Sequence, residues 1–263
     1  MMHAGLELAR RLEAAEGLNE VGCAEAHQQF NPALGSAVLE AGGGYAIFVG
    51  ADSPLTHAVT LGMRGPVSSE ELDCIEEFYR ARGAAAAVEL CPLADASLVE
   101  QLSARGYGLI EFNNVLVRPL AGTAIDPVES VRAAYTDEEY LWARTVACGF
   151  LEKDELTQDE LDVGRAIWHV PGARCYLAFS AGRATGAGAM AIHQGLAMFF
   201  ADSTLLGFRG AGLQQALIRA RLRIALEEGC DLATASTMPG SSSQRNYERH
   251  GFSVAYTKAV LAR

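Results

Sequence analysis

Lysine is the scarcest charged residue of this 263-residue sequence, which contains only Lys153 and Lys258. The formal net charge is −11, and the pI is near 5.0. Binding to a nucleic-acid backbone requires clustered basic side chains that displace counterions. The densest arginine group, Arg219, Arg221 and Arg223, alternates with apolar residues on one predicted helix, which indicates a solvated helix face. The sequence therefore argues against a nucleic-acid partner.

Closely spaced cysteine pairs are also missing. Structural zinc sites and redox motifs need two cysteines a few residues apart. The six cysteines of this chain are instead widely separated, at Cys23, Cys74, Cys91, Cys148, Cys175 and Cys230. We therefore expect no metal site of this kind, and we expect the thiols to be reduced and mostly buried.

The sequence has no long apolar run, and its first segment leads us to expect no cleavable leader. No stretch approaches the roughly 18 uninterrupted apolar residues of a membrane span. Residues 1–16 have the pattern of a charged amphipathic helix rather than that of a signal peptide. We therefore expect a cytoplasmic protein without a membrane partner. Half of the residues are apolar, which allows a substantial core in one large domain or two ordinary ones.

Helix and strand patterns alternate along the C-terminal half. The longest amphipathic pattern begins at Leu213 and ends near Gly229. Glycine-containing turns separate the strand patterns that precede it. In chain order, the pattern predicts a helix over 136–150, a helix over 157–168, strands over 174–180, 186–193 and 197–202, the helix from Leu213, a strand over 232–237, a helix over 242–250 and a strand over 252–261.

The N-terminal half repeats part of this order. Aligning Gly106-Tyr107 with Gly251-Phe252 places residues 115–118 on residues 260–263 without a gap. The preceding strand and helix patterns of the two halves coincide after shifts of only a few residues. Self-similarity at half the chain length predicts two domains of one architecture, and a chance match is the alternative.

The predicted domains cover residues 1–122 and 126–263. The boundary falls within residues 119–127, which are bracketed by prolines and have no sustained period. Because this linker is short, we expect the two halves to pack closely.

A glycine-bearing loop leads into the strongest helix of the sequence. Arg209-Gly210-Ala211-Gly212 follows a predicted strand and directly precedes Leu213. The first turn of a helix has free N–H groups and a partial positive charge, and glycines with positive φ let a pyrophosphate approach them. The loop lacks the Gly-Lys-Ser/Thr of a P-loop and the surrounding order of a dinucleotide-binding fold. It is therefore either a phosphate cradle of another kind or a plain turn.

This loop resembles the Gln/Arg-x-x-Gly-x-Gly/Ala signature of the GNAT acyltransferase superfamily. Arg209, Gly212 and Gln214 occupy the signature positions, although the family prefers a small residue where Gln214 stands. The resemblance implies acetyl-CoA as co-substrate and no metal, with the main chain at Thr204 and Leu205 holding the pantetheine arm. The pyrophosphate would lie on Arg209, Gly210, Ala211, Gly212, Leu213 and Gln214.

A second motif lies downstream. Tyr247 and Glu248, followed by Gly251-Phe252, resemble the family's Tyr-Glu-x-x-Gly-Phe marker on a helix beside the coenzyme. By this resemblance an amine attacks the thioester directly, and Tyr247 protonates the departing thiolate. A phenol suits this role because it is neutral at pH 7. The alternative is that Tyr247 is a packing residue. Asn246 either reaches a pantetheine amide or faces solvent.

The attacking amine must be deprotonated, so a base is needed near the thioester. Asp202, at the end of a strand, is the leading candidate, and His193 is the second. Either could instead be an ordinary strand-end residue. The resemblance assigns acceptor recognition to the first two helices of the domain, where aromatic and acidic residues suit a cationic amine but are also common in cores and on surfaces. These residues are Tyr140, Trp142, Phe150, Glu152, Lys153, Asp154 and Glu155.

The N-terminal half lacks both motifs. Arg64-Gly65-Pro66-Val67 stands where the loop should be, and Leu102 falls at the position of Tyr247. Proline removes an N–H donor. The resemblance implies an α+β (mixed α/β) GNAT-like fold in tandem, with a central, mostly antiparallel sheet per domain and a degenerate first copy.

The predicted function is an acetyl-CoA-dependent N-acetyltransferase that acts on a primary amine of a small molecule. A homodimer is one expected assembly. The alternative is a non-catalytic acyl-CoA sensor or interaction module.

Overall fold

The computed structural model describes residues 5–122 and 125–263. The chain forms two compact units, one of residues 1–115 together with 254–263 and one of residues 116–253. This division differs from the predicted domains, residues 1–122 and 126–263. The reason is that the last strand of the chain pairs within the first unit, while the residues that follow Val115 belong to the second.

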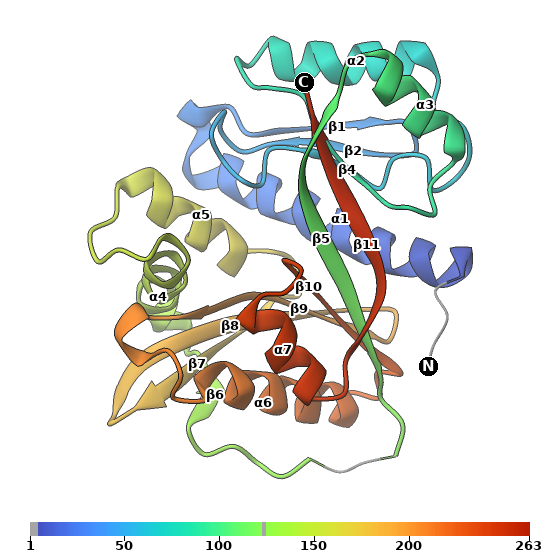
Figure 1. The fold of residues 1–263 in the computed structure, drawn as a ribbon. Helices are drawn as coiled ribbons and strands as arrows, with labels where there is room; N and C mark the ends of the chain where they lie inside the picture. Colours follow the sequence, from blue (N-terminus) through green and yellow to red (C-terminus); the bar gives the residue numbers. More distant parts are fainter. Residues whose placement is uncertain (1–4, 123–124) are drawn as a thin grey trace. The chain divides into compact units, whose positions relative to one another are not determined.

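The second unit contains a mixed set of helices and strands (Figure 1). Its strand and helix bounds agree closely with the sequence-based prediction. In chain order the elements are β6 (Val131–Ala133), η2 (Thr136–Glu138), α4 (Glu139–Leu151), α5 (Gln158–Trp168), β7 (Arg174–Ser180), β8 (Arg183–His193), β9 (Leu196–Thr204), η3 (Leu206–Phe208), α6 (Leu213–Glu227), β10 (Leu232–Thr237) and α7 (Ser242–Arg249).

The sheet of the second unit has the order β10-β9-β8-β7-β6. The end of β5 (Gly108–Pro119) lies beside β10. Within the unit, β6, β7, β8 and β9 pair antiparallel in sequence order, and β9 pairs parallel with β10. The connection between the two parallel strands contains α6, as a parallel crossover requires.

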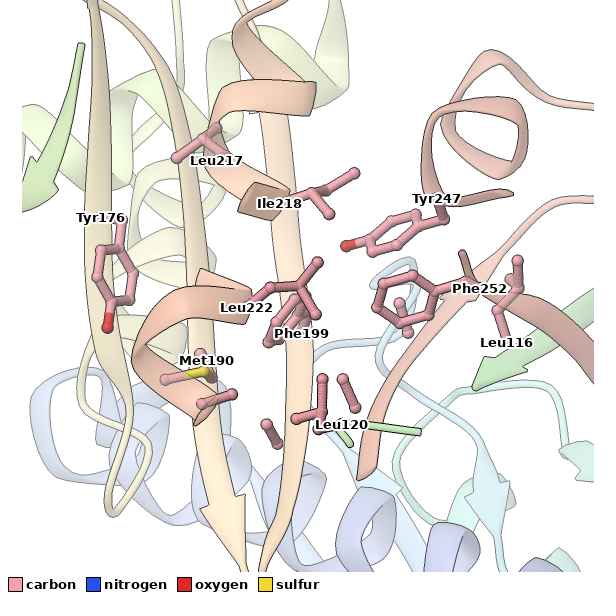
Figure 2. Packing of buried hydrophobic residues seen from close by; sticks show 14 of the residues in the cluster. Leu116, Leu120, Tyr176, Met190, Phe199, Leu217, Ile218, Leu222, Tyr247 and Phe252 are labelled. Carbon is pink, nitrogen blue, oxygen red and sulfur yellow. The ribbon is translucent and has the colours of Figure 1, made fainter. Parts of the chain in front are cut away.

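Alternate residues of these strands face two apolar cores, because successive strand side chains point to opposite faces. On one face Met190 and Phe199 pack in a buried cluster with residues of α6, including Leu217 (Figure 2). On the other face Leu177 and Ala189 pack with residues of α4 and α5. Each large apolar side chain buried in this way contributes about 1.5–3 kcal/mol.

The first unit has the strand order β1-β2-β3-β4-β11-β5. Val59 and Ile47 are buried strand residues, and Ile47 packs in a cluster with Ala24 of the long first helix, whereas the neighbouring Phe48 packs in the cluster that contains Ile75. The elements are α1 (Leu6–Phe30), η1 (Pro32–Leu34), β1 (Ala37–Ala41), β2 (Gly44–Phe48), β3 (Ala58–Val59), α2 (Ser69–Arg80), β4 (Ala87–Leu90), α3 (Ala96–Ala104), β5 and β11 (Ser253–Ala262).

The two units repeat one order of elements. Three strands, a helix, a strand and a helix occur as β1-β2-β3-α2-β4-α3 and again as β7-β8-β9-α6-β10-α7. In each unit the third of these strands pairs parallel with the fourth. The strand that follows the last helix is exchanged, since β11 pairs with β4 and the end of β5 lies beside β10.

A buried group of charged side chains accompanies β11 in the first unit. The ammonium of Lys258 is fully buried and lies 3.4 Å from Glu13 Oε1 and 3.2 Å from Glu89 Oε2, and it also pairs with Glu16. Removing one member of a buried ion pair costs about 3–5 kcal/mol because the other charge is left uncompensated. These ion pairs therefore help to explain why the last strand belongs to the first unit.

Cys74 is exposed and the other five cysteines are buried, all of them as free thiols. Within residues 5–122 and 125–263, no helix combines the length and apolar character needed to cross a membrane.

Candidate functional site

The strand β9 contains a bulge near its end. Residues Ala187 and Ala189 of β8 pair with Ser203 and Phe200, so two residues of β9 lie opposite one residue of β8. Ala201, within this bulge, has a φ of 56°, which is uncommon for a residue other than glycine. Bulges of this kind disrupt the regular pairing and redirect side chains.

The parallel pairing of β9 with β10 ends before the bulge. It runs from Leu196 opposite Leu232 to Phe199 opposite Ala235. Beyond Phe199, β9 continues to Thr204 and β10 to Thr237 without further pairing to each other among the described residues. Unpaired strand edges of this kind can take an extended chain, which adds like another strand.

The predicted glycine loop follows β9 and opens α6. Gly210 and Gly212 have φ values of 80° and 78°, and a Cβ on either would meet no atom within 4 Å. The left-handed backbone, rather than lack of room, therefore explains the two glycines. Gly212 is the N-cap of α6, and no side chain caps the helix there. The first N–H groups of α6 face a loop without bulky side chains, and no acidic residue lies in the first turn.

The corresponding helix of the first unit has a different N-terminus. Ser68 caps α2, and Glu71 accepts a 2.8 Å hydrogen bond from the Ser68 N–H. Arg64 and Pro66 precede this cap. A carboxylate of the chain itself therefore occupies the place where an external anion would meet the α2 donors. Leu102, at the position aligned with Tyr247, is fully buried.

Several of the predicted coenzyme-binding side chains contact one another. Arg209 donates to Gly149 O at 2.8 Å and pairs with Glu152 at 2.6 Å, so this side chain joins the loop to the end of α4. Gln214 donates to Ser243 Oγ, and its oxygen accepts from the Asn246 amide, both at 2.7 Å. Gln214 and Asn246 therefore join the first turn of α6 to α7. The family's small residue at the position of Gln214 would instead leave room for the coenzyme to approach the helix closely.

The main-chain N–H and carbonyl of Leu205 already form hydrogen bonds within the protein. Its N–H donates to Thr185 O at 3.0 Å, and its carbonyl accepts from the Phe208 N–H at 2.9 Å. Thr204 pairs with Gly186 of β8 at the last position of the hairpin. Leu205 therefore has no free N–H for a pantetheine arm, which corrects one part of the expected contact.

Tyr247 and Asp202 meet in the buried centre of the second unit. The Tyr247 hydroxyl donates a 2.6 Å hydrogen bond to Asp202 Oδ2, and Asp202 Oδ1 lies 2.5 Å from Arg221 Nη2. Tyr247 is 2% exposed, and its ring stands edge-on to Phe252 (Figure 2). Burial and the negative charge of Asp202 raise the pKa of Tyr247 well above its usual value. The phenol is therefore held neutral.

Arg221 is fully buried, which corrects the prediction that its helix face is solvated. Its Nη1 donates to Ala189 O at 2.8 Å and its Nε to Leu217 O at 3.1 Å, and its guanidinium lies 4.6 Å from the Phe199 ring centre. Burial opposes the charge, but Asp202 and Tyr247 together outweigh burial and raise the pKa of Arg221. The alternation of arginine with apolar residues along α6 predicted an exposed side chain. It was misleading because Asp202 of β9 supplies the counter-charge that lets Arg221 be buried.

Gly188 makes room for this group. A Cβ on Gly188 would lie 2.6 Å from Asp202 Oδ1 and 3.1 Å from Arg221 Nη1. Only glycine fits here without moving the carboxylate. A glycine inside a strand is a known sign of close approach, so this position carried a signal that the sequence analysis did not use.

The two candidate bases are far apart. His193 pairs with Leu196 at the turn between β8 and β9, whereas Asp202 lies near the other end of β9. Six residues of strand separate these positions, which is about 20 Å. Because β8 and β9 run antiparallel, the end of β8 lies beside the start of β9, so His193 and Asp202 lie at opposite ends of β9. Burial lowers the pKa of His193.

The residues expected to recognise the acceptor have different environments. Trp142 is fully buried, and its indole N–H donates to Tyr176 O at 3.1 Å, so it is a core residue. Tyr140 and Phe150 are 62% and 61% exposed. The acidic stretch after α4 contributes Glu152 to Arg209 and brings Lys153 to Glu160 at 2.6 Å.

One group of ligand-type side chains lies outside this region. Glu20, His57 and Glu89 of the first unit place their ligand atoms within 4.8 Å of one another. His57 Nε2 lies 3.4 Å from Glu20 Oε1, and the Lys258 ammonium lies 3.2 Å from Glu89 Oε2. Protonated His57 and Lys258 can balance these carboxylates without a metal ion.

The fold is similar to solved structures of GCN5-related N-acetyltransferases, one of them a tandem GNAT protein. A GCN5-related N-acetyltransferase from Kribbella flavida matches 100% of this chain and 96% of its own, with 18% identity and a TM-score of 0.65. A tandem GNAT protein from the clavulanic acid biosynthesis pathway, solved without AcCoA, matches 99% and 94%, with 16% identity and a TM-score of 0.60.

A GCN5-related N-acetyltransferase from Sphaerobacter thermophilus matches 79% of this chain and 71% of its own, with 14% identity and a TM-score of 0.58. The sequence matches no protein-family model and no curated protein. These similarities confirm the expected α+β fold of the GNAT type in a tandem arrangement.

Proposed function

We propose that the second unit transfers an acetyl or other short acyl group from coenzyme A to a primary amine of a small molecule. The observation that carries this proposal is the uncapped start of α6, which follows a loop with two left-handed glycines. This anion-binding geometry directly follows a strand whose outer edge is unpaired beyond Phe199.

The residues present fit a coenzyme with a pyrophosphate and an extended arm. The free N–H groups at Gly212 and Leu213 would receive the pyrophosphate, because no capping side chain or acidic residue competes for them. The unpaired edge of β9 between Phe199 and Thr204 would hold the pantetheine amides. The coenzyme supplies the activated acyl group as a thioester.

The acyl transfer forms one bond and breaks another. The amine nitrogen bonds to the acyl carbon, the carbon–sulfur bond breaks, the amine releases a proton to water and the thiolate takes a proton. We assign the second proton to Tyr247: its hydroxyl group turns from Asp202 to the thiolate, gives up its proton, and regains one from water before the next turnover. We assign to Asp202 the orientation of this hydroxyl group rather than the deprotonation of the amine, because its carboxylate accepts the Tyr247 hydrogen bond and its charge is neutralised by Arg221.

The burial of Tyr247 favours one alternative. A tyrosine that only packs in the core would also be about 2% exposed and would also bond its hydroxyl group to a neighbour such as Asp202. In that case the second unit is an acyl-CoA sensor or interaction module, with the same cradle and no turnover.

One experiment separates the two functions. Acetyl-CoA binding is measured by calorimetry, and thiol release is then followed with a broad panel of primary amines. The transferase predicts binding together with amine-dependent thiol release. Binding without release from any amine would establish the sensor instead, and loss of both would remove the coenzyme assignment.

A further inference from the structure

A polar pocket lies in the second unit, outside the proposed coenzyme cradle. It has a volume of about 450 Å³. The walls combine a strand end, one side of α6, the C-terminal end of α7 and the segment after residue 124. Its lining residues are Arg118, Ile125, Asp126, Arg219, Leu222, Arg249, His250 and Gly251.

The pocket collects positive charge in a chain whose net charge is −11. Arg118 donates to His250 O at 2.7 Å, and Arg249 donates to Asn246 Oδ1 at 2.9 Å. Among the described residues, Arg118, Arg219 and Arg249 form no ion pair with a carboxylate. The lining contains three guanidinium groups and a single acidic residue, Asp126. The pocket therefore has an uncompensated charge of about +2 when His250 is neutral.

His250 adds an unused polar atom. Its Nε2 is buried and has no hydrogen-bond partner among the described residues. Burial, together with the positive charges of Arg118, Arg219 and Arg249, lowers the pKa of His250. The imidazole therefore stays neutral at pH 7 and can donate or accept one hydrogen bond.

The pocket lies beside the middle of α6 and the C-terminal end of α7, whereas the cradle lies at the first turn of α6. Gln214, in the first turn of α6, contacts Ser243 and Asn246 in the first half of α7. Arg219 lies six residues after Leu213, about 9 Å farther along α6, and Arg249 is the last residue of α7. An occupant of this pocket therefore meets residues that the proposed pyrophosphate does not.

We propose that this pocket binds the phosphate group of a small phosphate monoester, independently of the acyl-transfer site. The three guanidinium groups come from three different elements, β5, α6 and α7. Their forked donors suit the several oxygens of a tetrahedral dianion, and the charge excess matches a dianion. Ile125 and Leu222 provide an apolar wall for the organic part of the ligand.

The test uses the full chain and titrates inorganic phosphate and glycerol 3-phosphate by calorimetry. We expect both probes to bind, and the double variant Arg219→Gln, Arg249→Gln to weaken both by at least tenfold. Arg223→Gln is the matched control, because Arg223 lies on α6, outside the lining, and pairs with Glu227. Its affinity for both probes should equal that of wild type. Thermal unfolding of each variant checks that the fold is retained.

A second titration distinguishes this pocket from a coenzyme subsite. Coenzyme A and dephospho-coenzyme A are titrated into wild type and the double variant. The proposal expects the double variant to bind both coenzymes as wild type does. A loss of affinity for coenzyme A alone would assign the pocket to the 3′-phosphate of the coenzyme and overturn the proposal. Phosphate binding that is unchanged in the double variant would overturn it as well.

Discussion

The hydroxyl of Tyr247 donates a 2.6 Å hydrogen bond to the carboxylate of Asp202. These residues are 45 positions apart in the sequence and were each considered as a catalytic group, yet the structure makes them partners. We therefore propose different roles for them, with Tyr247 as the proton donor and Asp202 as the group that positions its hydroxyl. This relationship leads to a direct test of Tyr247.

Replacing Tyr247 with phenylalanine removes the proposed proton donor and keeps the ring that packs on Phe252. We expect the turnover number for amine acetylation to fall at least tenfold, which corresponds to about 1.4 kcal/mol of activation free energy. The acetyl-CoA dissociation constant, measured by calorimetry, should stay within about twofold of wild type, since the phenol is not part of the cradle. Unchanged turnover would leave Tyr247 as a packing residue.

Replacing Arg221 with methionine tests whether its charge neutralises Asp202. The change leaves a buried carboxylate without its cation, and we expect the free energy of unfolding to fall by about 3–5 kcal/mol in urea titrations. In an Asp202→Asn background the same change should cost at least about 1 kcal/mol less, since the two residues interact directly.

Arg223→Met is the control for Arg221→Met. Arg223 lies on the same helix, is 32% exposed and pairs with Glu227 at the surface. Exposed pairs contribute about 0–1 kcal/mol. Equal losses in the two variants would show that Arg221 contributes through its aliphatic packing and not through Asp202.

Replacing Gly212 with aspartate tests the cradle. Asp and Asn both tolerate the left-handed backbone of this position, which has a φ of 78°. Gly212→Asn is therefore the matched control for backbone strain and side-chain size. The aspartate adds a negative charge beside the expected pyrophosphate, as Glu71 does at the start of α2. We expect acetyl-CoA to bind Gly212→Asp at least tenfold more weakly than Gly212→Asn in calorimetry, and equal affinities would remove the cradle assignment.

The sequence predicted the elements of the second unit well, since local signals determine them. The period of α6, the two glycines before it and the alternation in the strands all survive in the structure. No local sequence signal indicates which strand the last strand, β11, pairs with. The residues of β11 have the same pattern whether they pair with β4 or elsewhere, and it is only in the folded unit that Lys258 meets carboxylates from α1 and β4.

The candidate site shows the same division between local and tertiary information. The glycine loop at the start of α6 was predictable because a strand, two glycines and a strong helix are adjacent in sequence; phosphate binding there stays a proposal. The burial of Arg221 was not predictable, because an arginine between apolar residues of a helix is expected to be solvated. Only the folded structure places Asp202 of β9 beside it. Likewise, the sequence does not reveal that Gln214 and Asn246 bind each other.

Protonation of His57 links the stability of the first unit to pH. The charges of Glu20 and Glu89, opposed by burial, raise the pKa of His57 to about 9 from an ordinary value of 6.5. Because the folded pKa is the higher one, the stabilisation is fully present below about pH 6.5 and is lost as the pH rises through 9. The charged groups around this site are carboxylates from α1 and β4 and the Lys258 ammonium from β11.

We therefore expect the free energy of unfolding to fall by on the order of 1–3 kcal/mol between pH 6.5 and 9. Burial also raises the pKa of the neighbouring Glu16 to about 8, which makes stability fall with rising pH up to that value. Urea titrations at several pH values measure the slope, and His57→Gln should reduce it above pH 8, where the contribution of Glu16 declines. A slope above pH 8 that is the same in His57→Gln and wild type would show that His57 is not the group that titrates.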